Sequence, residues 1–413
     1  MSISVLQPGA KRTRKKRSPN FPMAGVMKPF GLYPLMAHLV LPGETLNSFN
    51  MKWRCLSKPV AHPLAGAWLE NWLVYVKLTD LDRDLGNMFI DDTYSTSGYT
   101  AASDSERYFT KTGQIDWIKL CCERIHDAYF MDDSETARTI DGVRQTKLSS
   151  MSWYQNCIFK PADDALDTTD VLDAYKEMDA YMMMQQMNMS ELTYEKYLEQ
   201  YGVSSVRAAE GDPEILRYSR SWTLPVNTVE PSTGAPSSAW VWSDEMKAEK
   251  DKRFNEPGFL ICLGSVRPKM YQKHQEFSMV GNQWGFTDWF PAYNLEDPTA
   301  GIREMVSTDL VFHADHRTDV GDVNILYDHR DLLSHGEQFV NEWGQTPYAL
   351  PLATGLLAED ASDNADLRGE YATSTDIDAL FSSATSTDKF CFYEGIAHAN
   401  ITGHITDTTP GGR

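Results

Sequence analysis

Two strand-like segments near the N-terminal end, and a third far along the chain, constrain the fold more than any other feature. Residues 49–56 alternate between apolar and polar side chains, with Phe49, Met51, Trp53 and Cys55 on one side. This alternation predicts a strand with one buried face. Residues 66–79 carry apolar side chains on both sides, which predicts a strand covered on both faces over part of its length. The apolar segment 258–268 is the third.

The chain between these segments has a different pattern of apolar and polar residues. Apolar residues recur at helical spacing within 116–130, and residues 190–202 begin with a Ser suited to an N-cap and end with Gly. From about 215 onward strand-like segments return, interrupted by a turn-rich loop at 229–238. Early and late strands must then pair across an insertion of about 130 residues. This arrangement predicts an all-β sandwich or jelly roll with helical insertions.

A cationic run at residues 11–17 contrasts with the rest of the chain. The chain carries −20 overall and the run carries +6, so the remaining residues carry −26. Residues 1–20 contain no acidic residue, and they lack apolar periodicity, so we expect an extended arm rather than a packed element. The favoured role is phosphate binding, with a solubilising tail or a nuclear-import signal as alternatives. The expected nucleic-acid-binding residues are Lys11, Arg12, Arg14, Lys15, Lys16 and Arg17.

No common catalytic signature is present, since the sequence lacks GxSxG, HExxH, GxGxxG and the phosphate-cradling GxxxxGK[ST]. We therefore predict no enzyme activity and no cofactor. The segment 313–319, HADHRTD, contains several side chains that could bind a metal, but their alternation along a strand would separate them. We interpret them as structural and predict no metal site, with a metal-binding or pH-sensing role as the alternative. Aromatic residues within 284–293 could stack on bases, although such clusters more often fill a core.

Six cysteines occur without a CxxC pair, and we interpret all six as free thiols of a reducing compartment. The basic run is not followed by an apolar segment, so a signal peptide is not expected. No apolar run approaches the length of a membrane span. The cysteines are Cys55, Cys121, Cys122, Cys157, Cys262 and Cys391.

Several segments, taken in order, resemble the major capsid proteins of microviruses, in particular the gokushovirus-like phages. Together they cover about half of the chain. The segments are LVLPGETL (39–46), the strands at 49–56 and 66–79, SELTYEKYLEQYG (190–202), SWTLPVNTVEPSTGAPSS (221–238), EPGFLICLGSVRPKMYQKH (256–274) and DWFPAYN (288–294).

The resemblance implies an eight-stranded viral jelly roll, a form of β-sandwich, in an icosahedral T=1 shell of about sixty copies around single-stranded DNA. It implies assembly in the bacterial cytoplasm and a place in the virion. The implied partners are a pilot protein, a small basic DNA-binding protein, an internal scaffolding protein and a receptor on the host surface. The basic arm is more pronounced than the family leads one to expect, so its role follows from its charge alone.

The expected organisation has four parts. Residues 1–20 form the basic, disordered or inward-facing arm, and residues 21–80 with 215–350 form the jelly-roll core. Residues 81–214 form the partly helical insertion, and residues 351–413 an acidic, loop-rich C-terminal segment. The alternative function is a carbohydrate-binding or glycoside-hydrolase β-sandwich, because acidic chains rich in exposed aromatic residues suit sugar binding.

Overall fold

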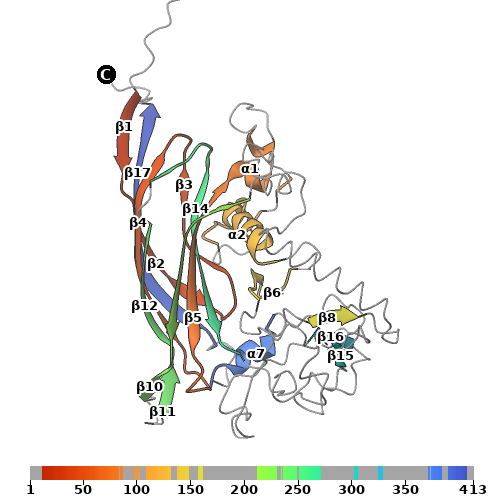
Figure 1. Ribbon diagram of the computed structural model, residues 1–413. Coiled ribbons are helices and arrows are strands. Elements are labelled where there is room, and N and C mark those ends of the chain that lie inside the picture. Colours follow the sequence, from red (N-terminus) through yellow and green to blue (C-terminus); the bar gives the residue numbers. More distant parts are fainter. Residues whose placement is uncertain are drawn as a thin grey trace, which may run out of the picture.

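The structure of the chain is a computed structural model, and it describes most of the strands and part of the long connections (Figure 1). The residues that it describes are 12–82, 84–86, 95, 98–99, 101–102, 108–131, 137–147, 157–160, 212–229, 234, 236–248, 251–270, 302–305, 324–328, 371–372, 374–383 and 389–406.

Two antiparallel sheets form the body of the molecule, and they lie side by side in Figure 1. We call them the first and the second sheet. In the first sheet the order is β2 (Asn20–Met27), β17 (Cys391–Thr406), β4 (Thr45–Ser57) and β12 (Val241–Ala248), with β1 (Arg12–Arg17) also on β17 and β13 (Lys252–Arg253) on β4. In the second sheet the order is β3 (Tyr33–Val40), β14 (Gly258–Pro268), β5 (Ala67–Lys77) and β9 (Glu214–Thr223).

The strand pairing is nested along the sequence. β2 pairs with β17, β3 with β14, β4 with β12 and β5 with β9. From β2 to β5, the partner strand therefore comes from progressively earlier positions in the second half of the chain. Successive strands from β2 to β5 alternate between the two sheets. The expected all-β sandwich, built by pairing over long sequence separation, is confirmed at this level.

The two strands expected near the N-terminal end behave as their patterns predict. In β4 the side chains of Phe49, Met51, Trp53 and Cys55 are buried, and they contribute to the core between the sheets. β5 is buried on both faces, because its two sets of apolar side chains enter two different clusters. β14, at the segment expected to be a strand, is likewise buried along most of its length.

A helix covers the outer face of the second sheet. α2 (Trp117–Tyr129) lies within the expected 116–130, and the Asp116 side chain caps it by accepting from the Lys119 backbone N–H. Its buried residues Ile118, Cys122 and Ile125 pack against the second sheet in the cluster that includes Val74 and Val76. The helix belongs to the insertion between β5 and β9, together with α1 (Leu78–Leu81), β6 (Thr139–Ile140) and β7 (Val143–Arg144). In Figure 1 both helices lie on the side of the second sheet, away from the first.

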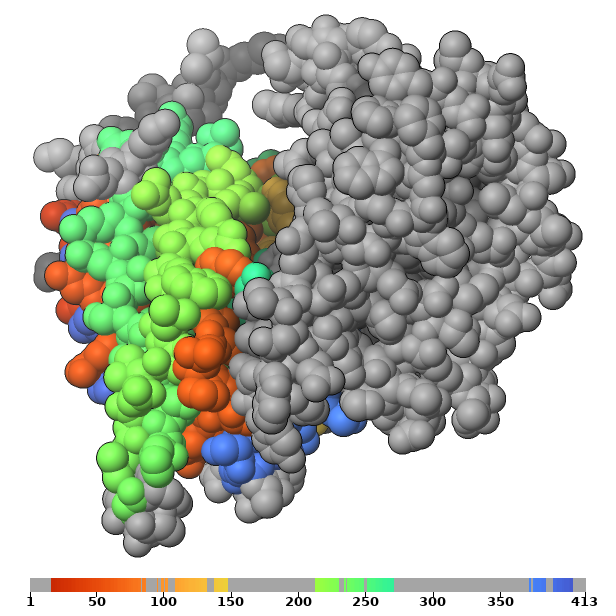
Figure 2. Space-filling view, turned by 60° about the horizontal axis from the view of Figure 1, so that its bottom comes forward, coloured from red at the N-terminus to blue at the C-terminus, as the bar shows by residue number. Residues whose placement is uncertain are grey.

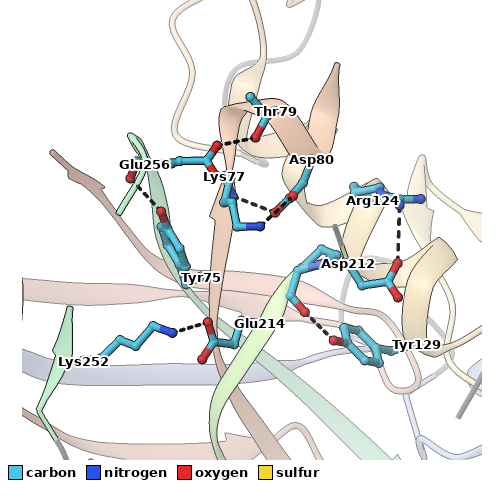
Figure 3. A network of polar contacts seen from close by, with 11 residues as sticks. Tyr75, Lys77, Thr79, Asp80, Arg124, Tyr129, Asp212, Glu214, Lys252 and Glu256 are labelled. Atoms are coloured by element: carbon cyan, nitrogen blue, oxygen red, sulfur yellow. Dashed lines mark hydrogen bonds and ion pairs between the residues drawn. The ribbon is translucent and has the colours of Figure 1, made fainter. Parts of the chain in front are cut away.

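Polar contacts hold the two ends of this insertion where they leave the sheet (Figure 3). At the exit from β5, the Asp80 carboxylate accepts from the Lys77 backbone N–H, 2.9 Å away. At the return into β9, the Arg124 guanidinium lies 3.4 Å from the Asp212 carboxylate, and the Tyr129 hydroxyl donates to the backbone carbonyl of Pro213. The start of β9 and the end of α2 are thus joined directly.

Three smaller elements complete the described part. β8 (Cys157–Lys160), β16 (Asn324–Asp328) and β15 (Ile302–Met305) form a small sheet that joins the insertion before β9 to the segment after β14. β10 (Val226–Val229) and β11 (Pro236–Ala239) form a hairpin, so the expected loop at 229–238 is shorter than predicted. α7 (Ser374–Ala379) is a short helix near the C-terminal end.

The expected boundary of the sandwich at residue 350 is wrong. β17 lies within the segment 351–413, which was expected to be mostly loop, and it occupies the middle of the first sheet between β2 and β4. Its inward positions carry Ala397, Ala399 and Ile401, all fully buried. Small side chains fit there because β17 crosses large neighbours: a Cβ on Gly395 would lie 2.4 Å from the Trp53 Cβ. A strand with such small inward side chains lacks the alternation of large apolar residues by which a strand is predicted from its sequence.

Other expectations fall outside the described residues. These are the helix at 190–202, the strands and aromatic residues between 284 and 294, and the histidine-containing segment 313–319. Cys55, Cys121, Cys122, Cys262 and Cys391 are all buried free thiols. Burial raises the pKa of the Cys121 and Cys391 thiols well above the usual value, so both stay protonated at neutral pH.

Candidate nucleic-acid interface

The cationic run is a strand at the edge of the first sheet. Residues 12–17 form β1, which pairs antiparallel with the end of β17 from Arg12 opposite Thr406 to Arg17 opposite Ile401. The expectation of an arm that packs on nothing is therefore wrong for these residues, although their backbone is extended as predicted. Composition does not reveal this strand, because backbone pairing with β17, and not the burial of apolar side chains, holds β1 at the edge of the sheet. Lys11 lies outside the described residues.

One of the six expected phosphate-binding residues is already paired within the chain. The Arg17 guanidinium donates to the Glu44 carboxylate at 2.5 Å. Glu44 is only 2% exposed, and the same oxygen accepts from the backbone N–H of Leu41 at 2.9 Å. A Cβ on Gly403 would lie 2.6 Å from the Glu44 Cγ, so glycine makes room for this carboxylate. Arg17 therefore fastens β1 to the turn between β3 and β4, and Lys16 beside it is exposed.

His38 lies beside this ion pair and adds no positive charge at neutral pH. Its ring centroid is 5.0 Å from that of Phe21. Burial lowers the pKa of His38, and the neighbouring Arg17 lowers it further, while Glu44 acts in the opposite direction. The lowered pKa favours the neutral form of the His38 imidazole.

The face of the first sheet that points away from the second sheet is uncovered within the part of the chain that the structure describes. We call it the open face, and Figure 1 shows it on the side opposite to α1 and α2. Its exposed charges are the cations Lys16, Lys52, Arg54 and Lys247 and the anions Glu245 and Glu394. Cations outnumber anions on this face, whereas the chain as a whole carries −20.

Glu245 is the anion that two of these cations share. Its carboxylate lies 3.3 Å from the Lys52 ammonium and 3.1 Å from that of Lys247. The hydrogen bond from Lys247, with that from Lys52, lowers the pKa of Glu245. Since all three groups are largely solvent-exposed, these pairs add little to stability, and both lysines can turn toward another anion.

An apolar row crosses the open face at one level. Val26, Phe392, Leu56 and Val241 lie opposite one another on four neighbouring strands. They are 52%, 42%, 46% and 41% exposed, respectively, so the row is a continuous apolar band on a solvent-facing sheet. The Lys58 ammonium lies 5.3 Å from the centroid of the Phe392 ring, within the range of a cation–π contact.

Cationic side chains next to an exposed aromatic ring are the chemistry that single-stranded nucleic acids need, because the cations bind phosphates and the ring stacks on a base. Sequence reasoning found the cations of β1 but missed Lys52, Arg54 and Phe392. The alternation along β4 already predicted that Lys52 and Arg54 lie on its exposed side. The contribution of Phe392 could not be found before β17 was known to be a strand.

Comparison with known proteins finds no family model that matches the sequence and no curated protein with significant similarity to it. Within the described residues, no cluster of three or more His, Cys, Asp or Glu side chains is placed to hold a metal ion. In the same part of the chain, no helix combines the length and the apolar character needed to cross a membrane.

Proposed function

We propose that this chain is the major capsid protein of a small icosahedral bacteriophage with a single-stranded DNA genome. The observation that carries the proposal is the nested pairing of β2 with β17, β3 with β14, β4 with β12 and β5 with β9. These eight strands, four from each of the two facing sheets, support an assignment as an eight-stranded jelly roll, a fold typical of viral capsid domains.

Jelly rolls also occur in lectins and cupins, so features beyond the fold distinguish these functions. Two further features favour a capsid. The ordered segments that resemble microvirus capsid proteins include β4, β5 and β14, which are central strands of the two sheets. A cationic edge strand on an acidic chain is unexpected in a sugar-binding protein, whereas it suits a shell that encloses DNA.

In the proposed particle the open face and β1 are turned toward the genome. Contacts of Lys16, Lys52 and Arg54 with phosphates need no base sequence, so packaging is non-specific and weakens as salt concentration rises. Arg17 is paired with Glu44, so about sixty copies with the five remaining charges of residues 11–16 supply about 300 positive charges, whereas a genome of a few thousand nucleotides carries roughly one negative charge per nucleotide. Most of the phosphate charge must therefore be neutralised by other cations, such as polyamines, divalent ions or a small basic protein.

Sedimentation of the purified protein, followed by electron microscopy, tests the proposal. We expect particles of uniform size that are far larger than the 46.7 kDa chain. A carbohydrate-binding protein would instead remain a monomer, and its tryptophan fluorescence would change with added oligosaccharide. A monomer at every protein concentration and salt condition would overturn the capsid proposal.

Neutralising the cationic strand should uncouple shell formation from DNA packaging. We expect the variant Lys15→Gln/Lys16→Gln to form shells of normal size with less DNA, because phosphate contacts are lost while Arg17 still fastens β1 through Glu44. The absorbance ratio at 260 and 280 nm of purified particles measures the DNA content. The matched control is Lys111→Gln/Lys119→Gln, which removes the same charge near and within α2 and should package normally. Equal DNA content in both variants would exclude β1 from packaging.

A further inference from the structure

The hairpin β10–β11 is an apolar projection at one end of the sandwich. Figure 1 shows it beyond the ends of the neighbouring strands, and in Figure 2 the same green segment extends past the body of the molecule. All four residues of β10 are exposed. The apolar side chains at this end are Leu64, Trp222, Leu224, Val226 and Val229, with exposures of 74%, 45%, 58%, 49% and 63%.

This end of the molecule is nearly free of charge. Residues 221–243 include the end of β9, the hairpin and the start of β12, and Glu230 is their only charged residue. The chain as a whole is 23% charged, so about five charged residues would be expected in a segment of this length. Copies of a chain that carries −20 repel one another, and they can meet most easily where neither contributes charge. A cationic partner would instead be attracted to the acidic surface elsewhere.

A groove lies beside the projection. One side is formed by residues after β4, including Pro59 and Pro63, and the other by the hairpin residues Val229 and Pro236. Lys58 is the only charged residue among those that line it. A projection next to a recess that is likewise poor in charge is the shape required for a head-to-tail contact, in which each copy both inserts and receives.

The hairpin also has an open strand edge. Within the described residues β10 and β11 form a sheet of two strands, and the only further backbone hydrogen bond to β11 runs from the Val60 N–H to the Ser238 carbonyl, so the outer edge of β10 is open. A two-stranded hairpin is marginal in water by itself, and open edges with exposed apolar side chains favour association.

We propose that the hairpin of one copy packs into the groove of a second copy, and that this contact joins neighbouring subunits. The proposal rests on the proposed assembly function and names the surface that carries it. Burial of Val226, Val229 and Leu224 supplies the apolar area, and the absence of charge removes the repulsion that the rest of the acidic surface would impose.

The double variant Val226→Asp/Val229→Asp tests the contact. Both positions are exposed in the single chain, so the fold should be retained, as circular dichroism and the melting temperature of the unassembled protein would show. Light scattering should show that the protein concentration needed for assembly rises at least about tenfold, because two carboxylates would be buried without partners.

The control is Leu39→Asp, which changes an apolar residue of similar exposure, 58%, on β3 of the second sheet, away from both the hairpin and the open face. We expect this variant to assemble within about twofold of the wild-type concentration. Unchanged assembly of the double variant, or equal impairment of the control, would overturn the assignment of the hairpin. If the wild type itself forms no particles, it is the proposed function that fails.

Mixed disulfides identify the surface that the hairpin meets. Copies with Val229→Cys are mixed with tagged copies that carry Pro63→Cys, allowed to assemble and then oxidised. We expect covalent dimers that contain one copy of each kind, since the two positions would face one another across the contact. Dimers of like copies alone would mean that hairpins meet each other, and the groove would be excluded as the receiving surface.

Discussion

A chain that ends at residue 388 should not fold. This truncation removes β17, the strand between β2 and β4, and leaves the inner edges of both neighbours without their hydrogen-bond partners. It also removes the fully buried side chains of Cys391, Ala397, Ala399 and Ile401 from the core. Loss of the Ile401 side chain alone costs about 1.5–3 kcal/mol. Each backbone group left unpaired in the interior costs about 1–3 kcal/mol, and β17 pairs with β4 at twelve positions and with β2 at eight, so the total exceeds the roughly 5–15 kcal/mol that stabilise a typical protein.

The soluble fraction after expression and the far-ultraviolet circular dichroism spectrum measure this effect. A chain that ends at residue 406 is the matched control, because it keeps the whole of β17 and should unfold at the same urea concentration as the full chain. Cooperative unfolding of the shorter chain near the urea midpoint of the full chain would mean that β17 is dispensable. The first sheet would then have to be held together in another way.

The second large loss of folding stability is expected for the variant Glu70→Ala. Glu70 lies on β5 and is 3% exposed, and its carboxylate binds groups from both neighbouring strands. Arg267 of β14 donates to it at 2.6 Å, the Tyr218 hydroxyl of β9 donates at 2.8 Å, and the Arg220 guanidinium lies 3.3 Å away. Burial and the bond to Glu70 raise the pKa of Tyr218 to about 12, so Tyr218 remains a donor at neutral pH.

Without Glu70 the Arg267 side chain, 12% exposed, loses its counter-charge, although it still donates to the Lys147 carbonyl at 2.6 Å. Loss of one partner of a buried ion pair typically costs about 3–5 kcal/mol. Urea unfolding of Glu70→Ala measures this loss. Glu245→Ala is the control, since it removes a carboxylate paired with two exposed lysines and should leave the urea midpoint nearly unchanged. Equal losses of unfolding free energy in the two variants would show that the buried position of the Glu70 ion pairs adds nothing to their effect on stability.

Sequence reasoning succeeded where local pattern and final environment agree. The alternation in β4, the apolar faces of β5 and the helical spacing of α2 each reflect burial that a few neighbouring residues determine. It failed for β17, because Gly395, Ala397 and Ala399 are small in order to fit against large side chains of β4, and only the partner strand explains them.

The candidate interface was predictable only in part. A run of cations indicates affinity for phosphate wherever it lies, but its place on the sheet depends on pairing with residues about four hundred positions away. The Glu70 cluster was missed, although it left a signal. A glutamate within the apolar segment 66–79 requires a buried cationic partner, and Arg267 is the arginine within the apolar segment 258–268.

The pairing of β1 and β2 with β17 has a consequence for synthesis in the cell. At about 5–20 residues per second, synthesis of the chain from Met27 at the end of β2 to Cys391 at the start of β17 takes about 20–70 s. Throughout that time β1 and β2 lack the strand with which they pair. Translation products that stop before β17 therefore cannot complete the first sheet.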